Sequence, residues 1–178
     1  KRKQSQSDSD LVSVVQFDGR SQVTVDLQPL SMAPTSLSYS GGGTRFYPAA
    51  QDACKLARGT PASHTPVIIF MSDGCANDAP NAAGEFSRLN NEVHTKTANH
   101  LELHVIAFGD GTDRAQLQQI AGTSRVGRVH ASSNTAELAS VFVDIATNQS
   151  VSFLLETEVA KKISEAVSDK LSLEYLGS

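Results

Sequence analysis

The sequence predicts an α/β domain with a mostly parallel central sheet, one antiparallel edge strand and helices on both faces. Two apolar segments bounded by turn residues, residues 65–71 and 103–108, are the main evidence for this fold class. Continuous apolar runs of this length are typical of strands that are buried on both faces of a parallel sheet. Segments with helical spacing alternate with these strands, and this alternation favours a parallel sheet covered by helices.

The N-terminal part of the chain predicts a hairpin. Leu11–Phe17 is rich in valine and indicates a strand, and residues 22–27 alternate apolar and polar side chains. Asp18 and Gly19 lie between the two segments and form a pair that is typical of tight turns. Because the second strand has one polar face, we expect it to be the antiparallel edge strand of the sheet.

Four later segments predict helices, because their apolar residues recur three and four positions apart. They are residues 46–58, 83–99, 113–121 and 136–147. Pro48 lies in the first turn of the first of these helices, where its missing N–H costs little. Thr112 or Asp113 is expected to cap the third helix. Residues 126–130 predict a short edge strand.

The composition is that of an ordinary globular chain, with 39% apolar residues, 19% charged residues and a net charge of −4. The acidic balance does not favour nucleic-acid binding, and the basic run Lys1-Arg2-Lys3 is short enough to be a solvated end. No apolar run approaches the roughly 18 residues that a membrane span needs. The two cysteines, Cys54 and Cys75, are too few for a disulfide framework. Their number favours a reducing, intracellular compartment.

In open α/β sheets, ligands bind outside the carboxyl ends of the strands. Three polar, glycine-containing loops are expected at that end: residues 41–44, 72–74 and 109–111. Thr44 offers a hydroxyl group and Asp73 a carboxylate, and such hard oxygen ligands suit Mg²⁺, which retains several waters. The alternative interpretation of Thr44 is a polar residue at a helix start. For Asp73 the alternative is a turn-forming residue before glycine.

The order of these motifs resembles the von Willebrand factor type A family over about residues 8–148. The resemblance rests on residues 10–17 (DLVSVVQF), Gly42-Gly43-Thr44, residues 67–74 (VIIFMSDG) and residues 104–109 (HVIAFG). It continues through residues 117–121 (LQQIA), Glu137-Leu138, Val141-Phe142 and Ile145-Ala146. Each piece is short, but the ordered set is specific to this family.

The resemblance implies a Rossmann-like, non-enzymatic module that binds an acidic residue of a protein partner through Mg²⁺ or Mn²⁺. It assigns Thr44 and Asp73 as ligands of a metal-ion-dependent adhesion site. The weaker candidates on the same ligand face are Gly43, Arg45, Gly74, Asp78 and Asp110. Of these, Asp78 is expected to be solvated and Asp110 to be a turn residue.

The family's third metal motif, Asp-x-Ser-x-Ser, does not occur in this sequence. By resemblance, this motif and the first strand are expected upstream of Lys1, so that residues 1–149 form an N-terminally incomplete domain. Residues 150–178 are expected to connect to a further domain or to form a C-terminal extension. They predict strands at 151–155 and 171–176 and a helix at 158–168.

Two other functions remain open. One is an interaction module that binds no metal, because Asp-x-Ser-x-Ser is absent. The other is a hydrolase that uses Asp73 and Cys75, although the sequence places no histidine to activate the thiol. The histidines form no zinc pattern, since His94 and His100 are expected to point in different directions from a helix. The glycine loop lacks the Lys-Ser/Thr ending of a phosphate-binding loop.

Overall fold

The computed structural model describes residues 10–34, 36–37 and 42–148. Its strands are β1 (Leu11–Phe17), β2 (Ser21–Pro29), β3 (Val67–Ser72), β4 (Glu102–Phe108) and β5 (Arg128–Ser132). Its helices are α1 (Phe46–Gly59), α2 (Ala79–Thr97), α3 (Arg114–Ala121) and α4 (Thr135–Asn148), with a short 3-10 turn, η2 (Leu30–Met32). The elements expected beyond residue 150, the run Lys1-Arg2-Lys3 and Gly41 lie outside the described residues.

The strands confirm the α/β class and are divided between two sheets. β3, β4 and β5 form a parallel sheet in that order, and β1 and β2 form an antiparallel pair. β3 was expected to be a central strand, but within the described residues it pairs with β4 alone. Its side chains reflect this edge position, since Val67 is 40% exposed and Ile69 and Met71 are half-buried.

Several element boundaries differ from the sequence-based prediction, among them the start of α2 and both ends of β5. Helix α2 begins at Ala79, one turn before the expected start at residue 83, with Pro80 in its first turn. A proline there has no N–H that the helix would use, so it extends the helix start. Strand β5 lies two residues later than expected, because Val126 and Gly127 still belong to the turn. A Cβ at Gly127 would overlap the Ala121 carbonyl, which shows how tightly that turn is packed.

The chain also reverses sharply after α2, and this brings two histidines together. Ala98 has a left-handed backbone, with φ of 60°, at the C-terminal end of the helix. The His94 and His100 rings stack at 4.6 Å with only 4° between their planes. The expectation that these two rings point in different directions was wrong, because it continued the helix through residue 99.

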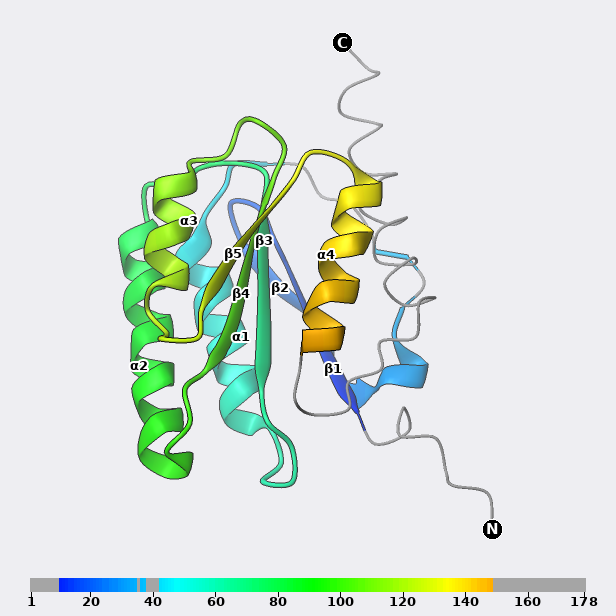
Figure 1. Cartoon of the computed structure of the whole chain (residues 1–178), viewed down its shortest axis with the longest axis vertical. Coiled ribbons are helices and arrows are strands. Elements are labelled where there is room, and N and C mark those ends of the chain that lie inside the picture. The colour runs from blue at the N-terminus through cyan, green and yellow to red at the C-terminus, as the bar shows by residue number, and fades with distance from the viewer. Residues whose placement is uncertain (1–9, 35, 38–41, 149–178) are drawn as a thin grey trace.

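Helices cover both faces of the parallel sheet, with α1, α2 and α3 on one side and α4 on the other (Figure 1). The three-helix face contains the larger core, in which Phe46, Phe70 and Phe86 are buried. Phe70 contacts both other rings edge-on, at 5.2 and 5.8 Å, and stacks on Phe17 of β1 at 5.3 Å. This aromatic group therefore joins β1 to the parallel sheet, although no strand pairing between them occurs within the described residues.

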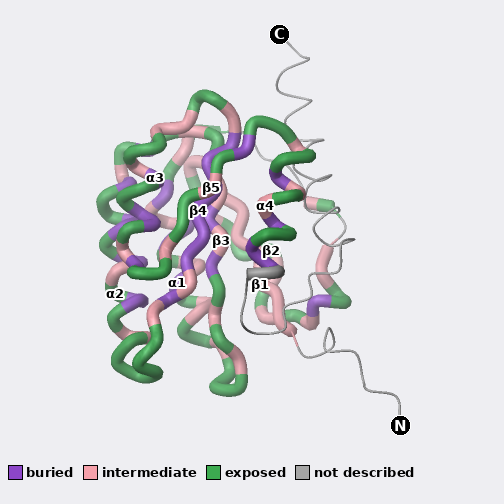
Figure 2. The backbone as a smooth tube through the Cα atoms, viewed as in Figure 1, coloured by how far each residue is buried: buried purple, intermediate pink, exposed green. Residues whose placement is uncertain are grey.

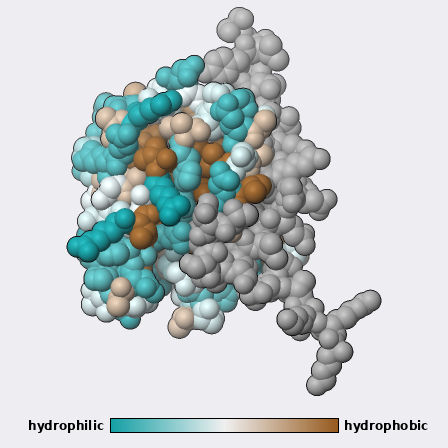
Figure 3. Space-filling view, in the orientation of Figure 1, coloured by the Kyte–Doolittle hydropathy of each residue, from teal (hydrophilic) through white to brown (hydrophobic). Residues whose placement is uncertain are grey.

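The α4 face has a smaller core. It consists of Ile106 and Phe108 from β4 and Leu138, Phe142 and Ile145 from α4. The buried positions concentrate along β4, while β1 is half-buried along its whole length (Figure 2). Apolar groups are also visible on the surface between α3 and α4 (Figure 3). Val129 of β5 and Val143 of α4 are exposed, and so is Val126 in the turn before β5.

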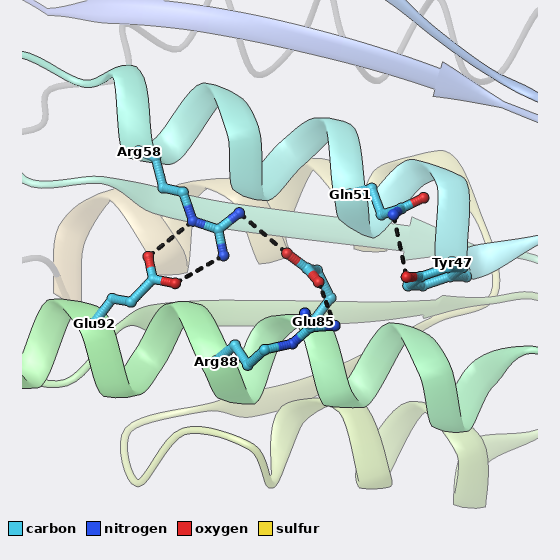
Figure 4. A network of polar contacts seen from close by, with 6 residues as sticks. All are labelled: Tyr47, Gln51, Arg58, Glu85, Arg88 and Glu92. Carbon is cyan, nitrogen blue, oxygen red and sulfur yellow. Dashed lines mark hydrogen bonds and ion pairs between the residues drawn. The ribbon is translucent and has the colours of Figure 1, made fainter.

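A network of ion pairs joins α1 to α2 on the three-helix face (Figure 4). The Arg58 guanidinium donates to both oxygens of Glu92, at 2.8 and 3.1 Å, and to buried Glu85 at 3.1 Å. Arg88 pairs with Glu85 at 2.7 Å from the other side. The hydrogen bonds from Arg58 lower the pKa of Glu92. The two helices are thus held together by charge as well as by apolar packing.

Candidate functional site

The three loops expected at the ligand face do meet there, at the carboxyl ends of the parallel strands (upper end of the sheet in Figure 1). A Cβ placed on Gly74 would lie 3.1 Å from the Thr44 hydroxyl oxygen, so the two loops are in direct contact. A Cβ on Gly111 would lie 3.5 Å from the Asp73 carbonyl oxygen. The loop of Asp73 therefore lies between the other two loops, and glycine at position 74 leaves room for the Thr44 side chain.

Thr44 and Asp73 present oxygen atoms that are not used elsewhere in the described part of the chain. Asp73 is exposed at the end of β3, and Thr44 is half-buried just before α1. Neither side chain forms a hydrogen bond or ion pair with another described residue. The Ser72 hydroxyl accepts the Gly74 N–H at 3.2 Å, which fixes the turn that carries Asp73. The two strongest sequence candidates thus lie on loops that contact each other, and their side-chain oxygens have no partner among the described residues.

Asp18 supports the Thr44 loop, and the sequence analysis missed this role. The Arg45 N–H donates to the Asp18 carbonyl at 2.8 Å. A Cβ on Gly42 would lie 3.3 Å from the Asp18 carboxylate, so that backbone packs directly on it. The Asp-Gly pair indicated a hairpin turn, and nothing local to it indicates that the turn also contacts a loop more than 20 residues later.

Asp78 was expected to be solvated, and this expectation was wrong. The residue is partly buried, with only 14% of its side chain exposed. Its Oδ1 accepts the Phe46 N–H at 2.8 Å and its Oδ2 accepts the Tyr47 N–H at 3.2 Å. The Arg45 guanidinium lies 3.4 Å from Oδ2. Asp78 therefore binds the first turn of α1 and is not a free carboxylate of the ligand face.

The remaining weaker candidates have other surroundings. Arg45 is largely exposed and pairs with Asp78, and exposed Gly43 has open space where a Cβ would lie. Asp110 is exposed in the turn after β4, next to Gly109 with its positive φ of 73°. This position agrees with the expectation that Asp110 is a turn residue.

Both cysteines are free thiols. Burial raises the pKa of Cys54 to about 12, so this thiol is unreactive. Cys75 is exposed beside Asp73 and Gly74, but no hydrogen bond joins its thiol to a histidine within the described ranges. The next residue, Ala76, donates its N–H to the Gln116 side chain of α3 at 3.0 Å, a second support of this loop that sequence patterns did not indicate.

No group of three or more His, Cys, Asp or Glu side chains in the described ranges is placed to hold a metal ion. No helix in the same part of the chain is long and apolar enough to cross a membrane.

Comparison with known proteins supports the resemblance seen in the motifs. The model of the von Willebrand factor type A domain family matches residues 2–144, which is most of the chain. A comparison with curated proteins finds no significant match. The matched range contains all three loops of the ligand face and every strand described above. The chain therefore belongs to the von Willebrand factor type A family, whose domains generally mediate protein interactions.

Proposed function

We propose that the chain is a protein-binding module that holds a Mg²⁺ or Mn²⁺ ion through Thr44 and Asp73 and uses it to engage an acidic residue of a protein partner. The observation that supports this most is the contact between Thr44 and Gly74. It brings a hydroxyl and a carboxylate from two separate loops to one end of the sheet. Binding of this kind involves no chemical step, so we expect no enzymatic activity.

The donor atoms fit such an ion. A threonine hydroxyl and an aspartate carboxylate are hard oxygen ligands, and Mg²⁺ accepts few protein ligands because it retains several waters. Neither side chain has another described partner, so metal binding would break no existing interaction of theirs. When bound, the ion would offer an open coordination position to a carboxylate of the partner.

The test uses Mn²⁺ as the probe, because its paramagnetism broadens NMR signals of nearby nuclei even when binding is weak. In the 178-residue chain, the amide signals of Thr44, Asp73 and Gly74 should broaden before those of α4. Thr44→Ala and Asp73→Ala should each reduce this effect by about 10-fold or more, as expected for the loss of one ligand. Ser63→Ala, in the α1–β3 connection, is a control that should bind Mn²⁺ like the parent chain.

Acetate, which carries the carboxylate of an acidic side chain, tests the partner chemistry. It should perturb the ligand-face signals in the presence of Mg²⁺ and leave them unchanged without it. Broadening that is equal in the parent chain and both alanine variants would disprove the site assignment. Zn²⁺ should show no preference for this site, because no soft ligand belongs to it.

A second candidate function is an interaction module that binds its partner without a metal ion. Two observations favour it: Asp-x-Ser-x-Ser is absent from the sequence, and no group of three or more His, Cys, Asp or Glu side chains among the described residues is placed to hold a metal ion. The Mn²⁺ titration separates the two functions, since this module would show no selective broadening around Thr44 and Asp73.

A further inference from the structure

Asp78 lies just before α2, but its side chain forms hydrogen bonds with α1. Its backbone carbonyl accepts the N–H groups of Asn81 and Ala82 in the first turn of α2, at 3.0 and 3.1 Å. Its carboxylate forms no cap hydrogen bond with α2. Both oxygens instead accept N–H groups from the first turn of α1, 31 and 32 residues earlier in the sequence. The residue therefore connects the starts of two helices.

Helix α1 needs this contact because it has no cap of its own. The first N–H groups of a helix have no partner within the helix, and a polar residue just before it commonly accepts them. In α1 that position is Arg45, which forms no side-chain cap hydrogen bond. A carboxylate is well suited to replace it, since negative charge is stabilised at the N-terminal end of a helix.

The Asp78 contact closes a ring of neighbouring groups around the ligand face. Thr44 contacts Gly74, the chain continues from Gly74 to Asp78, and Asp78 accepts the N–H groups of Phe46 and Tyr47, two and three residues after Thr44. We propose that Asp78 is the positioning residue that holds the Thr44 loop against the Asp73 loop, so that both candidate ligands face one ion. This inference rests on the proposed function and adds a residue that acts through Thr44 without touching the ion.

Asp113 provides a matched control for this role. It is also an aspartate at the same end of the molecule, and its Oδ1 accepts two helix N–H groups, from Ala115 at 3.0 Å and Gln116 at 3.2 Å. Its cap is local, because both donors belong to the helix that follows it. Asp78 therefore joins two segments that are distant in sequence, whereas Asp113 caps only the helix that follows it.

The experiment compares Asp78→Asn, Asp78→Ala and Asp113→Asn with the parent 178-residue chain. Amide exchange and the nuclear Overhauser contact between the Thr44 side chain and Gly74 are measured by NMR without metal. Mn²⁺ affinity is then measured by signal broadening. Asparagine keeps one acceptor oxygen and the shape of aspartate, so it tests the role even if the alanine variant does not fold.

We expect both Asp78 variants to exchange the Phe46 and Tyr47 amides at least 10-fold faster and to weaken the Thr44–Gly74 contact. Their Mn²⁺ affinity should fall by about 10-fold, the usual effect of losing a residue that orients a metal ligand. Asp113→Asn should speed exchange at Ala115 and Gln116 and leave Mn²⁺ affinity within about 2-fold of the parent, since it touches no ligand.

Parent-like Mn²⁺ affinity in the Asp78 variants, with faster exchange at α1, would overturn the positioning role and leave only a helix cap. Unchanged exchange would overturn the cap as well. If the parent chain itself binds no Mn²⁺, the proposed metal function fails. The positioning role is then decided by the Thr44–Gly74 contact alone: its loss in the Asp78 variants supports the role, and its persistence refutes it.

Discussion

The two faces of the parallel sheet differ in the depth of the core that covers them and in the charged groups they contain. The three-helix face has a large aromatic core and a network of carboxylates and guanidinium groups around Glu85. The α4 face has a smaller core, with the two rings Phe108 and Phe142 among aliphatic side chains, and two histidines, His104 and His130. The helices that follow the Thr44 and Asp73 loops, α1 and α2, pack on the three-helix face. The candidate site is therefore built on the more deeply packed half of the molecule.

The largest expected effect is that of removing an aromatic ring from each face. Phe86→Ala should lower the free energy of unfolding by about 4 kcal/mol, and Phe142→Ala by about 3 kcal/mol. Phe86 is fully buried and contacts Phe70, so its loss leaves a rigid cavity. Around Phe142, half-buried Ile69, Met71 and Val141 have more room to collapse into the space. Urea unfolding measures both values, and an equal or reversed order would contradict this view of the two faces.

Gly127 tests the packing at the edge of the sheet. A side chain at this position would overlap the Ala121 carbonyl, so Gly127→Ala must displace the end of α3 or the start of β5. We expect a loss of about 2–3 kcal/mol, typical of overpacking a site that cannot relax. Thermal unfolding gives the value. A variant as stable as the parent chain would show that the α3–β5 turn moves freely.

A fall in pH should destabilise the packing on the α4 face before that on the three-helix face. His104 shares the α4 side of β4 with Ile106, and its Nδ1 lies 3.0 Å from His130 Nε2. Burial lowers the pKa of both histidines, although Glu102 beside His104 and Asp144 near His130 act in the opposite direction. The unfolded chain therefore binds more protons than the folded chain, and stability falls as the pH drops through the ordinary histidine pKa of about 6.5.

Thermal unfolding between about pH 7.5 and about pH 5.5 covers this window, because ordinary carboxylates titrate below it. His130→Gln should lose less stability over this range than the parent chain. His100 also has a lowered pKa, caused first by desolvation and then by His94, so His100→Gln is the control for a contribution from outside the α4 face. Hydrogen exchange at β5 and α4 should rise before that at α1 and α2. The opposite order would contradict the proposed weakness of the α4 face.

The smallest expected effect is a gain of stability. Gly84 is exposed within α2, and a Cβ there would meet no other atom within 4 Å. Gly84→Ala should therefore stabilise the chain by about 0.5–1 kcal/mol, the usual cost of glycine inside a helix. Gly84→Ala and Gly127→Ala make the same substitution, but the first should raise the free energy of unfolding and the second should lower it. A destabilised Gly84→Ala variant would mean that α2 packs more closely than described.

Much of the fold could be predicted because it depends on local patterns. The valine-rich run predicted β1 with correct bounds, and the apolar spacing predicted the start of α1. Asp113 was expected as a possible cap because a helix cap lies next to the helix it serves. One boundary that was wrong, the end of α2, lies where a single backbone conformation decides it, at Ala98.

The sequence by itself determined which residues carry donor oxygens at the ligand face, since Thr44 and Asp73 each follow from a motif within a few residues. Only the tertiary structure decided which groups hold those residues in place. Asp18 and Asp78 act on the Thr44 loop from sites about 26 and 34 residues away, so no local period or spacing indicates the contact. A helix start without its own cap accepts any carboxylate that the fold brings near, and that placement depends on the packing of α1 against α2.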